Sequence, residues 1–208
     1  MRADDADLRG RMCVITGATS GIGRATATAL ARKGATLGLV ARDAARAEAT
    51  VRAIADATGN RDVTVFRADL ASQADVRRVA PEILARFPRI HVLLNNAGIV
   101  NLQRRVTVDG IEETFAVNHL AYFLLTLLLL DRLKASAPAR IVNVASDAHK
   151  FVGGIAWDDL NQEKAYGGMR VYGHSKLANI LFTRELARRL AGTASPSTPS
   201  IRAPWPPG

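Results

Sequence analysis

Short apolar runs alternate with segments of helical periodicity along most of this chain. Each run has the length of a β-strand, and most are followed directly by residues spaced like one face of a helix. The runs are residues 12–16, 35–41, 63–68, 91–95 and 140–145, and the helical segments are residues 22–33, 44–57, 75–87, 110–135 and 171–190. Strands this apolar, each followed by a helix, predict a parallel sheet with helices on both faces. We therefore expect a single α/β domain with a doubly wound parallel sheet.

Length and composition fit one soluble globular domain, because the chain has 208 residues of which 48% are hydrophobic. The longest nearly unbroken apolar stretch, residues 120–130, is shorter than the ~18–20 residues of a membrane helix. The acidic residues 1–7 lack the apolar core of a secretory signal. We expect a cytoplasmic protein without a membrane span. Its one cysteine, Cys13, is expected to be a small buried side chain rather than a reactive thiol.

The chain is basic, with a formal net charge of +9. A nucleic-acid-binding protein is therefore one class to consider, because clustered Lys and Arg side chains bind phosphates. The arginines are, however, spread along the whole sequence in runs of no more than two. We interpret them mainly as solvated helix faces and expect no nucleic-acid partner.

The helical segment at residues 110–135 is apolar around its whole circumference. Residues 111, 115, 122, 125 and 129 form one side, and Leu124, Leu127, Leu128 and Leu130 lie on other sides. Such a helix is buried on more than one face. Two interpretations stay open, namely a helix-to-helix contact in a homo-oligomer and an ordinary core helix. Residues 147–170 form a loop long enough to border a site.

A glycine-rich turn connects the first predicted strand to its helix, and residues 16–23 read T-G-A-T-S-G-I-G. Glycines let backbone N–H groups approach a pyrophosphate, and the helix N-terminus favours negative charge. The spacing G-x-x-x-G-x-G differs from the dinucleotide fingerprint G-x-G-x-x-G, so the turn alone is a weak indication. The candidate cofactor contacts here are Gly17, Thr19, Ser20, Gly21, Ile22 and Gly23.

Charged residues follow the next two predicted strands. Arg42 suits the 2′-phosphate of NADP, whereas an acidic residue at that place would bind the ribose hydroxyl of NAD. The sequence therefore favours NADP. Alternatively, Arg42 is only a solvated residue next to Asp43, which would cap the following helix. Asp69 could accept from an adenine amine or cap a helix, and with its neighbour Leu70 it is a candidate cofactor contact.

Tyr172 and Lys176 stand four residues apart in the last helical segment and therefore share one helix face. A nearby ammonium favours the phenolate form of a tyrosine. The pair can then donate a proton to a carbonyl oxygen or accept one from an alcohol. In isolation, such a pair is more often an exposed surface contact.

Taken together, these motifs resemble the short-chain dehydrogenase/reductase family. Besides the glycine turn and the Tyr/Lys pair, residues 95–98 read Asn-Asn-Ala-Gly, Asn118 lies in the long helical segment, and Ser146 follows the fifth strand. The resemblance extends from about residue 10 to residue 192. Residues 146–149 and 172–179 are most similar to the retinol-dehydrogenase-like branch. The resemblance implies a Rossmann fold and hydride transfer between a nicotinamide cofactor and a carbonyl or secondary alcohol. With Arg42, we expect an NADP-dependent oxidoreductase with a small-molecule substrate.

The resemblance also implies a role for each matching position. Tyr172 would be the general acid/base, and Lys176 would favour its phenolate and bind the nicotinamide ribose. Ser146 would hold the substrate oxygen, and Asn118 would help to carry protons through a water molecule. The cofactor site near the adenosine ribose would be lined by Asn96, Ala97 and Gly98. Hydride transfer with a nicotinamide needs no metal, and none is expected.

The family pattern breaks after residue 192, where a further strand, a Pro-Gly turn and a substrate-covering segment should follow. Residues 193–208 are instead rich in proline, which cannot donate to a central sheet ladder. One set of codons for this tail, read one nucleotide earlier, encodes a credible strand and a Pro-Gly turn. We therefore expect a domain at residues 1–192, lacking its last strands, and an aberrant tail from a truncation or frameshift. A nucleotide-binding protein without catalytic activity is the alternative function.

Overall fold

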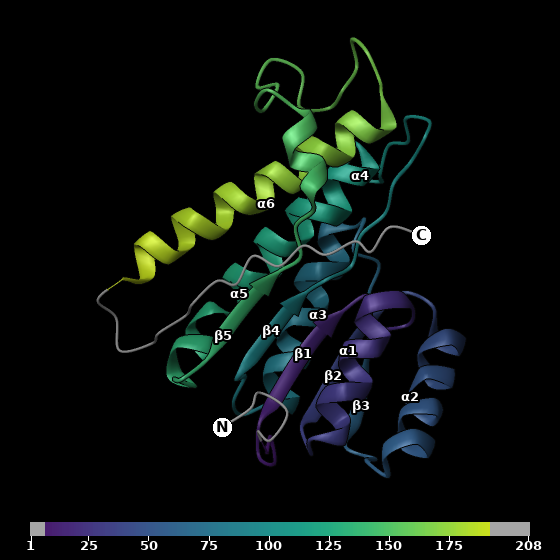
Figure 1. Ribbon diagram of the computed structural model, residues 1–208, viewed down its shortest axis with the longest axis vertical. Helices are drawn as coiled ribbons and strands as arrows, with labels where there is room; N and C mark the ends of the chain where they lie inside the picture. Colours follow the sequence, from purple (N-terminus) through teal and green to yellow (C-terminus); the bar gives the residue numbers. More distant parts are fainter. Residues whose placement is uncertain (1–6, 192–208) are drawn as a thin grey trace.

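The computed structural model describes residues 7–191, and its centre is a parallel sheet of five strands (Figure 1). The strands are β1 (Met12–Thr16), β2 (Thr36–Ala41), β3 (Val63–Arg67), β4 (Val92–Asn95) and β5 (Arg140–Asn143). Their order in the sheet is β3-β2-β1-β4-β5, and every neighbouring pair is parallel. The chain adds β2 and β3 on one side of β1 and then β4 and β5 on the other side. The predicted doubly wound sheet is therefore confirmed.

Helices connect the strands and cover both faces of the sheet. They are α1 (Gly21–Arg32), α2 (Ala44–Thr58), α3 (Gln73–Arg86), α4 (Glu113–Phe115), the π-helical turn η2 (Ala116–Leu120), α5 (Ala121–Ala135), the 3-10 turn η3 (Asp147–Phe151) and α6 (Gly168–Leu190). The Asp43 carboxylate caps α2 by accepting from Arg46 N at 3.0 Å, as the sequence predicts. Asp69 does not cap α3, because Ser72 holds that place.

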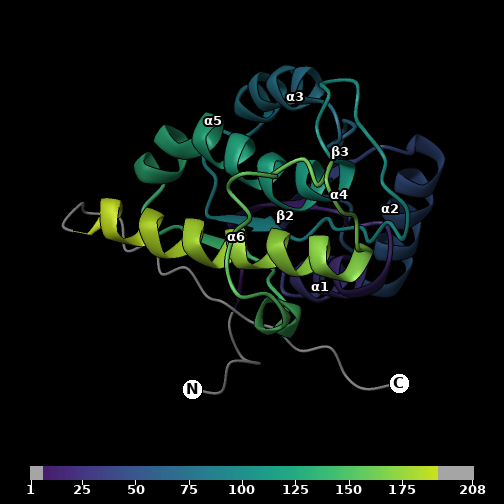
Figure 2. The same ribbon diagram turned by 90° about the horizontal axis from the view of Figure 1, so that it is seen from above.

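Helices lie on both faces of the sheet (Figure 2). Two clusters of apolar side chains hold these layers together. On one face of the sheet, α1 and α2 pack small and branched side chains such as Ala27 and Ile54 against β1 and β2. On the other face, α3, α5 and the end of α6 contribute residues such as Ile83, Leu125 and Leu186. The adjacent residues Cys13 and Val14 of β1 belong to opposite clusters, because successive side chains of a strand point to opposite faces of the sheet. Burial raises the pKa of the Cys13 thiol to about 12, so the expected inert cysteine is confirmed.

The long helical segment begins later and is less regular than predicted. The chain enters it at Glu113 instead of residue 110, because Glu112 accepts hydrogen bonds from Thr114 N and Phe115 N and so caps the helix. Residues of η2 then widen the helix into a π turn around Asn118. The apolar pattern continues unchanged through this turn, so the sequence does not reveal it.

The helical stretch Glu113–Ala135 is long and apolar enough to cross a membrane by length and hydropathy alone. In this fold it lies against α3 and the sheet, and Leu125 and Leu129 are fully buried there. A core helix meets the same criterion, so the expected absence of a membrane span stays a prediction. The predicted tail at residues 193–208 lies outside the described residues.

Candidate active site

The predicted site residues gather where the strands end. β1, β4 and β5 lie next to one another in parallel, so the segments that follow them meet at one edge of the sheet (Figure 1). In a doubly wound sheet, ligands bind at this edge, where the strand order reverses. The reversal here falls between β1 and β4, which places the glycine turn beside residues 96–98.

The glycine turn is closed too tightly for side chains at two positions. Gly17 has a φ of 68°, and a Cβ atom there would lie 2.6 Å from Ala97 Cα. A Cβ atom at Gly23 would strike the Gly17 carbonyl oxygen and lie 2.5 Å from Asn96 Nδ2. Both distances are shorter than ordinary van der Waals contact. Glycine is therefore required where the turn packs against the loop that follows β4.

Thr16 and Asn96 hold these two segments together. The Thr16 hydroxyl accepts from Asn96 N at 2.9 Å and from Ala97 N at 3.0 Å. In return, Asn96 Nδ2 donates to the carbonyl oxygens of Thr16 at 3.0 Å and Gly17 at 3.2 Å. Thr16 is not among the site residues predicted from the sequence. It is the last residue of β1 and the first residue of the glycine turn.

The glycine turn fits the pyrophosphate of a dinucleotide. Ser20 is the N-cap of α1, and its side chain forms no capping hydrogen bond. The first N–H groups of a helix have no intrahelical partner and are free to bind an anion. Gly21 has a φ of 50° and open space where a Cβ atom would stand, so the backbone is accessible there. Thr19 and Ile22 flank this opening, and Ile22 is exposed although apolar.

Arg42 and Asp69 face each other across the ends of β2 and β3. Their nearest charged atoms are 3.6 Å apart, and both side chains are substantially exposed. Asp69 also accepts from Ala71 N at 2.9 Å within its own turn, which Leu70 forms with it. The structure thus brings the two predicted cofactor contacts together at the edge of the sheet.

Lys176 is the most deeply buried cation of the site, with only 2% of its surface exposed. Its Nζ donates to the Val144 carbonyl oxygen at 3.0 Å and lies 5.4 Å from the centre of the Tyr172 ring. Burial lowers the pKa of Lys176 to about 8, because water no longer solvates its charge. An ammonium therefore stands beside the half-buried phenol of Tyr172, as the i, i+4 spacing predicts.

Asn118 is fully buried in η2, and its side-chain amide forms three hydrogen bonds. Oδ1 accepts from Ile99 N at 2.8 Å, while Nδ2 donates to the Ile99 carbonyl at 2.9 Å and to Ser175 Oγ at 3.1 Å. A Cβ atom at Gly98 would lie 3.5 Å from Asn118 Oδ1 and 3.7 Å from Lys176 Nζ. The structure therefore brings Gly98, Asn118 and Lys176 together.

A chain of buried amides and hydroxyls supports this arrangement from behind. Asn179 Nδ2 donates to the Asn118 carbonyl at 2.8 Å, and its Oδ1 pairs with His119 Nδ1 at 3.0 Å. Burial lowers the pKa of His119. Since an amide oxygen can only accept, His119 Nδ1–H is the donor in this contact. Sequence reasoning missed Asn179 and Ser175, although both lie on α6 within one turn of Lys176.

Ser146 follows β5, which ends at Asn143, and is the N-cap residue of η3. Its hydroxyl accepts from Ala148 N at 3.2 Å, and its carbonyl oxygen accepts from His149 N at 3.1 Å. The recorded contacts of Ser146 are thus within its own turn and not with Tyr172. A loop connects β5 to α6 as predicted, but η3 occupies its first part and α6 begins at Gly168, three residues earlier than predicted.

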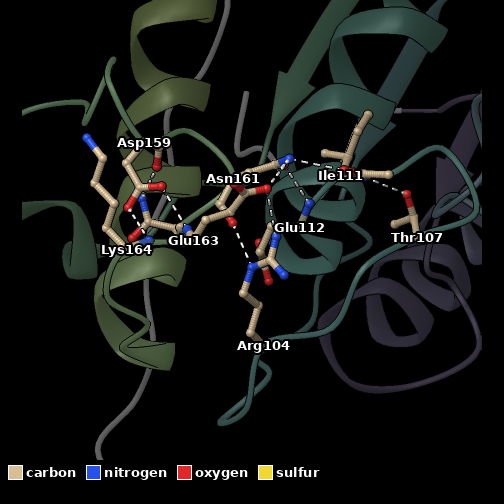
Figure 3. A network of polar contacts seen from close by, with 10 residues as sticks. Arg104, Thr107, Ile111, Glu112, Asp159, Asn161, Glu163 and Lys164 are labelled. Atoms are coloured by element: carbon tan, nitrogen blue, oxygen red, sulfur yellow. Dashed lines mark hydrogen bonds and ion pairs between the residues drawn. The ribbon is translucent and has the colours of Figure 1, made fainter.

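A polar network ties this loop to the segment that follows β4 (Figure 3). Asn161 accepts from Glu112 N at 3.1 Å and donates to the Gly110 carbonyl at 3.0 Å. Arg104 donates to the Asn161 carbonyl at 2.9 Å and pairs with Glu163 at 3.3 Å. The two loops on this side of the site therefore form one connected wall.

Comparison with known proteins agrees with this geometry. Residues 11–194 match the model of the short chain dehydrogenase family. Mouse (Mus musculus) retinol dehydrogenase 12 is 48% identical over 189 residues, which cover 91% of this chain and 60% of that protein. Human retinol dehydrogenase 11 is 48% identical over 186 residues, covering 89% of this chain and 58% of that protein. The chain thus spans about three fifths of the length of these relatives.

Solved structures share the fold. An uncharacterised protein from Mycobacterium paratuberculosis is 42% identical with a TM-score of 0.80, over 93% of this chain and 68% of that one. A short-chain dehydrogenase from Sphingobium yanoikuyae, solved in complex with NADPH, is 30% identical with a TM-score of 0.73, over 92% of this chain and 70% of that one. By its sequence motifs, its fold and these matches, the chain belongs to the short-chain dehydrogenase family.

Proposed function

We propose that this chain is an NADP(H)-dependent oxidoreductase that transfers a hydride between nicotinamide and a carbonyl or secondary alcohol. One observation carries the proposal: the buried ammonium of Lys176 lies 5.4 Å from the centre of the Tyr172 ring, at the edge of the sheet where the glycine turn lies. The same edge offers a glycine-lined helix N-terminus for a pyrophosphate.

Tyr172 acts as the general acid/base in this proposal. Its hydroxyl donates a proton to the carbonyl oxygen during reduction and accepts one during alcohol oxidation. The positive charge of Lys176 favours the phenolate that remains after donation, and the Val144 carbonyl keeps the ammonium in place. A bound nicotinamide supplies or accepts the hydride, which is the chemistry of the cofactor itself.

Ser146 and Asn118 have supporting roles. The Ser146 hydroxyl holds the substrate oxygen. It accepts from Ala148 N, which leaves its own O–H free to donate to that oxygen. Asn118 fixes the loop after β4 through both Ile99 backbone groups, and we propose that it helps to carry protons through a water molecule. Lys176 also binds the nicotinamide ribose.

The cofactor assignment rests on Arg42. A guanidinium at the end of β2 can bind the 2′-phosphate that distinguishes NADP from NAD. Gly17, Gly21 and Gly23 with Thr19, Ser20 and Ile22 would hold the pyrophosphate, and Asp69, Leu70, Asn96, Ala97 and Gly98 would line the adenosine. The complex of the Sphingobium yanoikuyae relative with NADPH supports this assignment.

A homo-oligomer is a further part of the proposal. Phe123 and Leu127 of α5 are exposed although apolar, and they lie on the side of the long helix that faces away from the core. A second copy of the chain covering this side would remove them from water. The share of protein that sediments as a dimer tests this point directly.

The test compares wild type with Tyr172→Phe, with NADPH and a panel of carbonyl compounds. Retinaldehyde belongs in the panel because of the names of the mouse and human relatives. We expect turnover by wild type and a loss of about 10²–10⁴-fold in the variant, which lacks the proton donor. NADPH binding should be nearly unchanged. Retained turnover in the variant refutes the role of Tyr172, and cofactor binding without any wild-type turnover supports a catalytically inactive nucleotide-binding protein.

A further inference from the structure

Lys176 carries its charge into the protein without a carboxylate partner. Among residues 7–191 it forms no ion pair, and its recorded hydrogen bond is to the neutral Val144 carbonyl. A buried ammonium is costly unless other groups offset the lost hydration. Any further group that attracts the ammonium would offset part of this cost.

Tyr122 provides a second aromatic wall for the ammonium. Lys176 Nζ lies 5.8 Å from the centre of the Tyr122 ring and 5.4 Å from that of Tyr172. Cations within about 6 Å of a ring centroid are attracted by its negative face, most strongly where water is excluded. Tyr122 is fully buried, so its ring meets that condition.

The hydroxyl of Tyr122 reaches the loop that follows β4. It donates to the Ala97 carbonyl oxygen at 2.7 Å. Burial holds the pKa of Tyr122 well above its usual value, and the neighbouring Tyr172 raises it further. Tyr122 therefore keeps its proton at every working pH and remains a hydrogen-bond donor, in contrast to an acid/base that must release its proton.

The π turn places this side chain. Tyr122 follows Asn118 by four residues, and η2 connects the two. Asn118 is itself held by Ile99 and Ser175. One stretch of helix thus presents two side chains to the site, one facing the loop at Ile99 and the other facing Ala97 and Lys176.

We propose that Tyr122 is a positioning residue that couples the ammonium of Lys176 to the cofactor-lining loop at Ala97. Its ring stabilises the ammonium and its hydroxyl fixes the Ala97 carbonyl. The inference rests on the proposed function, because positioning matters only if Lys176 and residues 96–98 serve a bound nicotinamide cofactor.

Two variants separate the two parts of the side chain. Tyr122→Phe keeps the ring and removes the hydroxyl, whereas Tyr122→Leu removes both. Tyr166→Phe is the control, because it also removes a phenol that donates to a backbone carbonyl, that of Asn101 at 2.9 Å. The Tyr166 hydroxyl also lies 3.3 Å from Glu112 Oε1, and the rings near the Lys176 ammonium are those of Tyr122 and Tyr172. Circular dichroism checks the fold, and Tyr122→Met replaces the Leu variant if that variant does not fold.

The first measurement is the pKa of Lys176, from NMR of isotopically labelled lysine side chains. The sequence contains five lysines, and Lys176→Arg assigns the signal. Losing the ring should lower the pKa of Lys176 by about 0.5–1 unit, because the charged form loses a stabilising contact. Tyr122→Phe and Tyr166→Phe should leave it unchanged. An unchanged or raised pKa in the ring-less variant overturns the proposal.

The second measurement is the dissociation constant for NADPH. Tyr122→Phe should raise it about three- to tenfold, as expected for one lost hydrogen bond, while the control leaves it unchanged. Unchanged affinity in Tyr122→Phe overturns the coupling to the loop. The NMR titration of Lys176, unlike the affinity measurement, needs neither cofactor nor turnover. A shifted pKa in a chain that shows no turnover would therefore refute the proposed function and leave the position of Tyr122 beside Lys176 supported.

Discussion

Lys176 and Tyr172 lie one helical turn apart on α6, with the ammonium of the first 5.4 Å from the ring centre of the second. The lysine is buried, and the tyrosine is half-buried at the open edge of the sheet. This relationship places a charge where water cannot screen it, next to a phenol that a substrate can reach. The surrounding residues hold this pair and the neighbouring glycine turn in place.

The buried Lys176 should make the stability of the fold depend on pH. Its pKa is about 8 when folded and 10.5 when unfolded. Between these values the unfolded chain binds more protons, so the contribution of this group to the free energy of unfolding rises with pH. Below pH 8 the charged lysine costs the fold on the order of 3 kcal/mol.

Lys176→Met removes this dependence, and urea unfolding from pH 7 to pH 10.5 measures the effect. Between pH 7 and pH 10.5, the free energy of unfolding of wild type should rise relative to that of the variant by up to about 3 kcal/mol. A difference between the two proteins that stays constant with pH would show that the lysine is not desolvated.

Gly23→Ala should disrupt the glycine turn. The added Cβ atom would strike the Gly17 carbonyl oxygen and Asn96 Nδ2, so the turn and the loop after β4 must separate. We expect a loss of about 2 kcal/mol in stability and of detectable NADPH binding. Gly154→Ala is the control, because a Cβ atom there meets nothing within 4 Å. Equal thermal shifts with NADPH in both variants would contradict the expectation.

Thr16→Val should weaken the contact between β1 and the loop after β4. The valine keeps the shape of the side chain, but the partly buried N–H groups of Asn96 and Ala97 lose their acceptor. A fully buried unsatisfied donor costs about 1–3 kcal/mol, so we expect a loss near the lower end of this range, which urea unfolding resolves. Thr16→Ser keeps the hydroxyl and should retain most of the stability. If both variants are equally stable, the hydroxyl does not hold the loop.

Arg42→Asp should shift cofactor preference from NADPH towards NADH. The carboxylate would repel a 2′-phosphate and accept from a ribose hydroxyl instead. We expect the ratio of the two dissociation constants to change by at least tenfold, measured by fluorescence titration. Arg52→Asp, on the exposed side of α2, makes the same change in charge and should leave the ratio unchanged. An equal effect of both substitutions would reduce Arg42 to a surface charge.

The fold was largely predictable from the sequence. Its strands are apolar on both faces, so their continuous apolar runs differ from the helical periodicity of most helices. Val14 and Ile15 show why: each is buried, but in a different cluster on a different face of the sheet. The cap at Asp43 was also predictable from its place before α2. The π turn was not, because Asn118 interrupts an apolar helix that otherwise keeps its pattern.

The candidate site was predictable where a motif carries the chemistry and not where a side chain arrives from elsewhere in the fold. Tyr172 and Lys176 are four residues apart, so helix geometry alone pairs them. Tyr122 counts in the sequence as one more apolar residue of the long helix. Its contacts with Ala97 and Lys176 cross separations of 25 and 54 residues, which no local pattern records. For Ser146, the sequence predicts the position after β5 but not the hydrogen bond by which its hydroxyl caps η3.

Deuteride transfer tests the central claim most directly. The wild-type chain is incubated at neutral pH with NADPH deuterated at the transferred position and with the carbonyl panel, and the alcohol products are analysed by mass spectrometry. We predict one deuterium per product molecule from wild type and none above background from Tyr172→Phe. The absence of deuterated product from a wild-type chain that is folded and binds NADPH would contradict the proposed oxidoreductase activity.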